Sequence, residues 1–332
     1  MAKKLTTITY KPTSIKIRLY LKRLVIVLLS LCLCVLVLAP FIAIPLFVNQ
    51  HVTYRGYATE KYPLQDIYQA NDYSLKEKQM YLTTEDGLKI WTSEIYTSKP
   101  KAVIIYLSGI AQPSITYFYG HAKLMQEHGF ASILLEVRGH GKSDGGRITL
   151  GYEEIMDVKA VVAYIRSNAS YDNVPIVLHG VSMGGAASIN AFGQIKEIDG
   201  LIAMSAYSSF EDVVIDLLHS YRVPDFLLRL EKPLLSAALK LLYGKEAVEN
   251  LTPLKQIKNT NERPVLLIAC TGDANVPVSS TLRLQEANPE VQIWLRDSWE
   301  HFIIKDCDFI NVALDQEYCD KILSFLNNIV NK

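Results

Sequence analysis

Cysteine is scarce in this chain of 332 residues, and the spacings that bind metal ions are missing. Cys32 and Cys34 lie in an apolar stretch near the N-terminus, and Cys270, Cys307 and Cys319 lie in the C-terminal third. No C-x-x-C pair occurs, so the sequence favours neither a zinc site nor a redox motif. Pairing of Cys307 with Cys319 in an oxidising compartment stays open, because spacing alone does not bring their Cα atoms together.

Acidic residues are absent from the N-terminal region, where no Asp or Glu precedes Glu60. Seven basic residues stand unopposed before Leu24: Lys3, Lys4, Lys11, Lys16, Arg18, Lys22 and Arg23. Removing these seven from the 34 basic residues of the chain leaves 27, against 34 acidic residues. The remainder is mildly acidic, which argues against a nucleic-acid partner.

Charged residues are also absent from Leu24 to Val48, a run dense in Leu and Val. About 20 apolar residues suffice to cross the hydrocarbon core of a bilayer. The alternatives are a cleaved signal peptide, for which the run is long and lacks a small-x-small cleavage site, and a buried helix, for which it lacks a polar face. The pattern favours an uncleaved transmembrane anchor over residues 24–48.

The charge asymmetry around this run predicts its orientation. Lys and Arg remain on the cytoplasmic side of a membrane. We therefore expect a basic cytoplasmic tail over residues 1–23 and a single-pass protein of the cell membrane whose folded domain is extracytoplasmic. The polar, Tyr-rich residues 49–78 are interpreted as a stalk, and residues 79–332 as the folded domain.

Low-complexity tracts and repeats are missing from the body, where short apolar runs alternate with helical patterns. Residues 81–96 predict a β-hairpin, and further strands are expected at 102–107, 131–137, 174–179, 200–206, 264–270 and 291–297. A helix is expected over residues 152–168. Such alternation predicts an α/β fold with a doubly wound, mostly parallel sheet. The long interval over residues 207–263, rich in leucine, predicts a short helical cap.

The motif Gly180-Val181-Ser182-Met183-Gly184 follows a strand and precedes a helix-forming segment. A nucleophile in this position sits on a tight, strained turn, and its neighbours must lack side chains to let the chain pass. Ser182 is therefore the candidate nucleophile, although a simple Gly-rich turn is the alternative. The N–H group of Met183 is a candidate oxyanion donor.

Serine needs a base within hydrogen-bond reach and a group that orients the base. His301 follows the last predicted strand, at the sheet edge where open α/β sheets place their sites. The other histidines fit less well, because they fall in helices, in a strand, in a Gly-rich loop, in the cap or beside the anchor. Asp273 follows another strand and completes the order Ser, Asp, His, while Glu211 and Asp212 are rival acids.

These residues resemble the α/β-hydrolase superfamily over roughly residues 80–330. Arg138-Gly139-His140-Gly141-Lys142-Ser143 looks like the R-G-x-G-x-S loop of the superfamily, and Asp273 with Val276-Pro277 matches its D-x-x-V-P turn. The likeness is greatest to membrane-anchored, short-cap members similar to serine aminopeptidase-like and monoacylglycerol-lipase-like hydrolases. Two departures are Ser108 where many relatives have histidine, and Glu136 where aspartate is usual.

The resemblance implies a two-step acyl transfer. His301 accepts the proton of Ser182, Asp273 orients the imidazole, and the N–H groups of Met183 and Ile110 form the oxyanion hole. The expected substrate is a small-molecule or acyl-bearing ester, thioester or amide, and no metal or organic cofactor is needed. The alternatives are an aminopeptidase-like serine peptidase and a catalytically silent binding module that keeps the fold.

Overall fold

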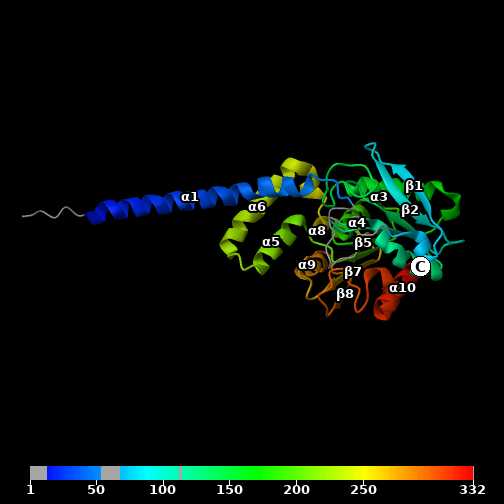
Figure 1. Ribbon diagram of the computed structural model, residues 1–332. Helices are drawn as coiled ribbons and strands as arrows, with labels where there is room; N and C mark the ends of the chain where they lie inside the picture. Colours follow the sequence, from blue (N-terminus) through cyan, green and yellow to red (C-terminus); the bar gives the residue numbers. More distant parts are fainter. Residues whose placement is uncertain (1–12, 54–67, 111, 113, 332) are drawn as a thin grey trace, which may run out of the picture.

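The computed structural model describes residues 13–53, 68–110, 112 and 114–331, in which helices cover both faces of one eight-stranded sheet (Figure 1). The strand order is β1-β2-β4-β3-β5-β6-β7-β8. The strands are Lys78–Thr83 (β1), Lys89–Ile95 (β2), Val103–Leu107 (β3), Ala131–Leu135 (β4), Ile176–Val181 (β5), Gly200–Met204 (β6), Val265–Cys270 (β7) and Gln292–Arg296 (β8). β2 is antiparallel to both β1 and β4, and all other pairs are parallel. The predicted doubly wound sheet is confirmed.

Alternate residues of the central strands face two separate apolar cores. On β3, Val103, Ile105 and Leu107 belong to one core, whereas Ile104 and Tyr106 belong to the other. The helices are Thr13–Val48 (α1), Tyr119–Glu127 (α2), Glu154–Ser167 (α3), Met183–Gln194 (α4), Phe210–Ser220 (α5), Asp225–Tyr243 (α6), Lys245–Asn250 (α7), Pro253–Gln256 (α8), Ser279–Ala287 (α9) and Gln316–Val330 (α10). Residues of α3, α4 and α9 pack in the first core, and residues of α2 and α10 pack in the second. Strands buried on both faces explain the continuous Val, Ile and Leu runs in the sequence.

Helix α1 is longer than the apolar run and continues through Pro40 and Pro45. Its length and composition suit a membrane span, and a signal sequence would share both properties. Pro40, Ile44 and Val48 are buried at intervals of four residues, so one stripe of its last turns packs on the domain. Residues 1–12 of the expected basic tail lie outside the described residues.

Part of the expected stalk is docked on the domain. Val52 is buried, and its N–H donates to the Gly139 carbonyl at 2.8 Å. The His51 ring nitrogens lie 2.7 and 2.9 Å from the carbonyl oxygens of Gly145 and Gly141. A short 3₁₀ helix at Ala70–Tyr73 also packs on the domain, while residues 54–67 of the expected stalk lie outside the described residues. The apolar Val52 explains the docking that the polar composition of this segment did not indicate.

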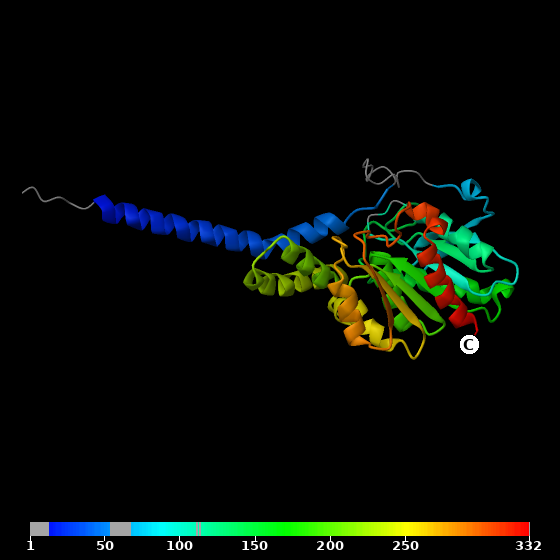
Figure 2. The same cartoon turned by 90° about the horizontal axis from the view of Figure 1, so that it is seen from below.

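The interval 207–263 is helical, as the cap prediction requires. It holds α5, α6, α7, α8 and a 3₁₀ turn at Ile257–Asn259. Helices α5 and α6 form a hairpin that extends from the domain alongside α1, in the direction of the N-terminus of α1 (Figures 1 and 2). The cap is therefore next to the apolar helix.

The open question of the two C-terminal cysteines has a structural answer. Cys307 and Cys319 are both free thiols, and the Cys319 thiol donates to the carbonyl of Val312 at 3.3 Å. Cys270 is free and buried. The described fold therefore contains no bond between Cys307 and Cys319.

Candidate active site

The turn around Ser182 joins the end of β5 to the start of α4. Ser182 has φ 56° and ψ −122°, a left-handed conformation that costs a non-glycine residue free energy. Its N–H donates to the Met204 carbonyl of the neighbouring strand β6 at 2.8 Å, and its carbonyl accepts from the N–H of Ala186 at 3.0 Å. The strained conformation is thus fixed by the sheet on one side and the helix on the other.

The glycines of the motif are required by close backbone contacts. A Cβ atom on Gly180 would lie 2.2 Å from the Gly184 carbonyl oxygen. A Cβ atom on Gly184 would lie 2.3 Å from the carbonyl oxygen of Ser108 and 2.4 Å from that of Leu107. These oxygens belong to the backbone of α4 and of the end of β3, so they cannot move aside without disturbing the helix or the sheet. This is the physical reason for glycine at both positions.

His301 lies on the loop after β8, and hydrogen bonds to the backbone of this loop hold it in place. The Ser205 hydroxyl donates to the carbonyl of His301 at 2.7 Å. At the end of β8, the buried Arg296 donates to the Ile303 carbonyl at 2.9 Å and pairs with Asp315 at 2.5 Å. Sequence reasoning missed Ser205 and Arg296; the signal for Arg296 was a single basic residue inside an apolar strand.

Asp273 lies on the loop after β7 and contacts His301 directly. Its Oδ2 lies 2.7 Å from His301 Nδ1, while its Oδ1 accepts the N–H groups of Asn275 at 2.8 Å and Val276 at 3.1 Å. The Asp273 side chain is fully buried, and the His301 side chain is 12% exposed. This arrangement fixes the imidazole with Nδ1 as the donor, which leaves Nε2 free to accept a proton.

The rival acids face other partners. Asp212 accepts from Lys232 at 2.6 Å and from the Ser208 hydroxyl at 2.8 Å. Although burial raises it, the pKa of Asp212 is lowered overall by these hydrogen bonds. Burial raises the pKa of Glu211, whose Oε2 has no hydrogen-bond partner among the described residues. Neither carboxyl group contacts His301, so Asp273 is the acid that the structure brings to it.

Among the described atoms, no hydrogen bond joins the Ser182 hydroxyl to the ring of His301. Catalytic hydrogen bonds of this kind are often long before substrate binds and shorten in the complex. Both residues follow parallel strands of one sheet, at its carboxyl edge. The arrangement therefore contains a nucleophile candidate and a preformed acid–base pair at the same edge.

The loop after β3 lies against the nucleophile turn. A Cβ atom on Gly109 would lie 3.1 Å from Ser182 Cβ and 3.0 Å from Gln112 Oε1. Gln112 Oε1 accepts from the Gly109 N–H and from the Tyr117 hydroxyl. Since the Gly109 N–H is occupied, Ile110 stays the donor candidate in this loop. Gln112 was missed because no motif marked it.

Met183 is the first residue of α4 and is fully buried. N–H groups in the first turn of a helix have no acceptor within the helix, so they are available to an anion. Met183 directly follows Ser182, which puts its N–H beside the candidate nucleophile. Met183 and Ile110 thus remain the two candidate oxyanion donors.

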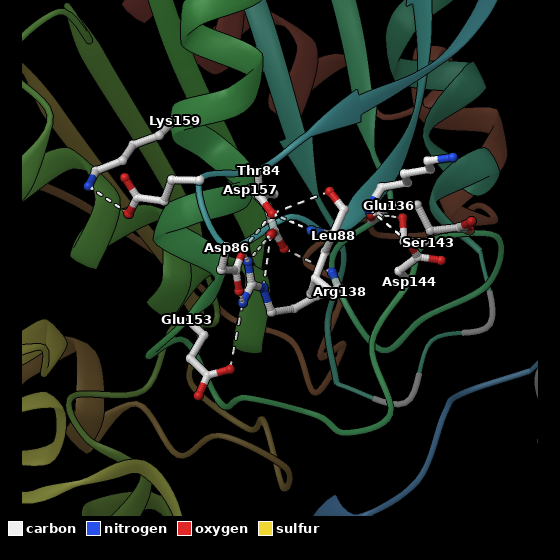
Figure 3. A network of polar contacts seen from close by, with 12 residues as sticks. Thr84, Asp86, Leu88, Glu136, Arg138, Ser143, Asp144, Glu153, Asp157 and Lys159 are labelled. Atoms are coloured by element: carbon white, nitrogen blue, oxygen red, sulfur yellow. Dashed lines mark hydrogen bonds and ion pairs between the residues drawn. The ribbon is translucent and has the colours of Figure 1, made fainter.

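The loop after β4 has a structural role. Arg138 is buried and contacts Asp86 and Asp157, each at 2.8 Å, and Glu153 at 3.6 Å (Figure 3). These contacts tie the loop to the β1–β2 turn and to α3. The same loop accommodates Glu136, which replaces the usual aspartate. A Cβ atom on Gly141 would lie 2.2 Å from the carboxyl carbon of Glu136. The glycine makes room for the longer side chain.

The buried histidines are unsuited to act as the base. His179 on β5 and His121 on α2 lie in one aromatic cluster, with ring centroids 5.8 Å apart. Burial lowers the pKa of His179 to about 3 and that of His121 well below its usual range. Burial also lowers the pKa of His140 to about 4. All three stay neutral at neutral pH, inside the fold.

A cavity of about 770 Å³ lies between α5 and α6. Glu211 and Ser236 line its base, and His219 and Asp225 line it at the hairpin tip. None of the three residues Ser182, Asp273 and His301 lines it. The cavity is therefore separate from the acid–base pair of Asp273 and His301.

Residues 98–229 match the model of the family described as serine aminopeptidase, S33. This segment includes Ser182 but neither Asp273 nor His301. The chain is 31% identical over 183 residues to the uncharacterized protein YqkD of Bacillus subtilis, an alignment that covers 54% of this chain and 58% of YqkD. The matched region thus spans little more than half of that relative.

Solved structures share the fold over a larger part of the chain. An esterase of Pyrococcus furiosus has a TM-score of 0.60 at 22% identity, covering 79% of this chain and 94% of the esterase. An acylaminoacyl peptidase of Pyrococcus horikoshii has a TM-score of 0.57 at 19% identity, covering 76% of this chain and 41% of the peptidase. The sheet order and these likenesses show that the chain has the α/β-hydrolase fold, and residues 98–229 within it are similar to the serine aminopeptidase family.

Proposed function

We propose that this chain is a serine hydrolase that cleaves carboxylic esters through an acyl-enzyme on Ser182. The observation that carries the proposal is the 2.7 Å contact between His301 Nδ1 and the buried Asp273, at the sheet edge that also holds the strained Ser182 turn. A base with a fixed tautomer is what a serine hydroxyl needs to become nucleophilic near neutral pH.

In the proposed reaction, His301 Nε2 takes the Ser182 hydroxyl proton as Oγ attacks the substrate carbonyl. The N–H groups of Met183 and Ile110 stabilise the oxyanion, and Asp273 stabilises the imidazolium. His301 then returns the proton to the leaving alcohol, which departs with the electrons of the broken ester bond. Water attacks the acyl-enzyme by the same route and releases the acid.

An ester is favoured over a peptide as the substrate. The alignment with the Pyrococcus furiosus esterase covers 94% of that esterase. The alignment with the acylaminoacyl peptidase covers only 41% of that peptidase. A serine peptidase remains the second candidate, because the family model is that of serine aminopeptidases. Thioesters and amides use the same acyl transfer. Parallel assays with acyl esters and aminoacyl amides distinguish the two activities.

We also propose that α1 is an uncleaved anchor and that the hydrolase domain lies on the extracytoplasmic side of the cell membrane. Cleavage after α1 would remove Ile44 and Val48, which are buried in the domain core. The basic residues before Leu24 favour a cytoplasmic N-terminus. Protease added to intact cells is expected to digest the domain; digestion only after lysis would reverse the topology.

The test of the hydrolase proposal uses the full chain in detergent, since its anchor packs into the domain. The wild-type protein is expected to hydrolyse p-nitrophenyl butyrate. Ser182→Ala and His301→Ala should each lower kcat by several orders of magnitude, with about 10⁶ as a guide. Ser220→Ala, at an exposed site on the cap hairpin, is the matched control and should retain activity. Wild-type activity in Ser182→Ala would end the proposal.

A further inference from the structure

Large apolar side chains are exposed near the tip of the α5–α6 hairpin. Tyr221 is 80% exposed, Phe226 is 65% exposed and Leu230, one turn further along α6, is 50% exposed. Exposed apolar groups that cluster in this way mark a surface that contacts another apolar phase or partner. The identity of that phase follows from the helix beside the hairpin.

Helix α1 packs along α6. Ile44 and Val48 of α1 share one apolar core with Leu235 and Leu239 of α6. The last turns of α1 therefore belong to the domain, and the uncharged part that projects from it is residues 24–39, about 24 Å long at 1.5 Å per residue. The hydrocarbon core is thicker, about 30 Å, so a bilayer crossed by this part reaches the turns of α1 that pack on the domain.

The hairpin extends beside α1 toward this free part, as both views show (Figures 1 and 2). Its tip is thus on the side of the domain from which the apolar stretch of α1 projects. When residues 24–39 are in a bilayer, a hairpin reaching along the same helix meets the bilayer surface. The bilayer is therefore the apolar phase that the exposed side chains of the tip are positioned to contact.

The charges of the hairpin suit a lipid surface. Arg222 at the tip and Arg229 on α6 are exposed, and neither forms an ion pair with any described residue. The nearby Asp225 faces His219 at 3.9 Å instead. Aromatic and leucine side chains combined with free basic groups are the features of interfacial elements, since arginine binds lipid phosphates while apolar groups enter the acyl boundary.

We propose that the tip of the α5–α6 hairpin inserts into the surface of the bilayer that α1 crosses. Tyr221, Phe226 and Leu230 enter the boundary between headgroups and acyl chains, and Arg222 binds lipid phosphate. The inference rests on the proposed anchor. It places the tip end of the 770 Å³ cavity, at His219 and Asp225, against the lipid. An amphiphilic ester that resides in the membrane would then reach the cap without passing through water.

The test is fluorescence quenching of the full chain in vesicles of phosphatidylcholine brominated on its acyl chains. Tryptophan is introduced in three separate variants: Phe226→Trp at the tip, Leu29→Trp in α1, and Tyr81→Trp on β1. All three positions are exposed. The signal of each variant is compared with that of the wild-type protein, which has three tryptophans. Circular dichroism in detergent verifies that each variant is folded.

We expect the added fluorescence to be largely lost in Phe226→Trp and Leu29→Trp and to be retained in Tyr81→Trp. Quenching of Leu29→Trp without quenching of Phe226→Trp would overturn the docking while leaving the anchor intact. Absence of quenching in Leu29→Trp would overturn the anchor and the docking together. Ester hydrolysis does not enter either criterion, so a failed hydrolase proposal is distinguished from both.

Discussion

The turn around Ser182 and the α5–α6 hairpin follow neighbouring strands, β5 and β6, yet different contacts hold them. Around Ser182, neighbouring backbone atoms pack so closely that Gly180 and Gly184 have no room for a methyl group. On the hairpin, Tyr221 and Phe226 point away from the protein core. The geometry of the first region is determined within the chain, whereas the exposed side chains of the hairpin have room to contact what lies outside it.

The largest effect is expected at the acid that serves the nucleophile turn. Asp273→Asn leaves the shape of the site but removes the charge that holds the His301 tautomer, so kcat should fall by about 10⁴. Asp212→Asn is the matched control, because Asp212 binds Lys232 and not His301. Steady-state kinetics on a p-nitrophenyl ester measure both. A larger loss in Asp212→Asn would show that the acid is misassigned.

A methyl group at Gly184 tests whether the turn is fixed by close packing. In Gly184→Ala the new Cβ would meet backbone oxygens of Ser108 and Leu107, so we expect the free energy of unfolding to fall by more than about 3 kcal/mol. Gly146→Ala is the control, since nothing lies within 4 Å of its added Cβ, and it should change stability by less than about 0.5 kcal/mol. Denaturant unfolding in detergent compares them. Equal stability of the two variants would contradict the packing argument.

Acyl-chain length tests whether the apolar cap contributes to substrate binding. Each buried methylene contributes about 0.8 kcal/mol, or roughly a fourfold gain in kcat/KM. We therefore expect esters with acyl chains of four to about ten carbons to be preferred over acetate. The measurement is kcat/KM across a p-nitrophenyl ester series. A flat or falling series from acetate to octanoate would show that the cap leucines only cover the sheet.

The smallest effect is expected at the hairpin tip. Because Phe226 is 65% exposed, Phe226→Ser should change the free energy of unfolding in detergent by less than about 0.5 kcal/mol. Hydrolysis of a water-soluble ester should stay at the wild-type rate. A large loss of stability would mean that Phe226 packs within the protein, and the contrast with the Ser182 turn would then disappear.

The sequence predicted most of the sheet because strands buried on two faces need continuous apolar runs, and it marked Ser182 because the turn needs glycines. It did not reveal how His301 is held. Ser205 and Arg296 act through the backbone of His301 and Ile303, and such contacts join residues distant in the chain without any local pattern. The docking of Val52 was hidden for the same reason, since its partner Gly139 lies in another loop.

The direction in which the α5–α6 hairpin extends could not be predicted from the sequence either. The leucines of residues 211–244 predicted helices, but apolar excess alone does not distinguish a core, a ligand and a bilayer as the contact. Packing of α6 on α1 places the hairpin beside the apolar helix, and this contact joins segments that no local pattern connects.

The central claim, that Ser182 is an activated nucleophile, is tested most directly by a fluorophosphonate probe on the full-length protein followed by peptide mass spectrometry. The account predicts one adduct, on Ser182, in the wild-type protein, and none in Ser182→Ala. Labelling of His301→Ala should be strongly slowed, because the hydroxyl then lacks its base. An unlabelled wild-type protein that is folded, or an adduct on another serine that persists in Ser182→Ala, would contradict it.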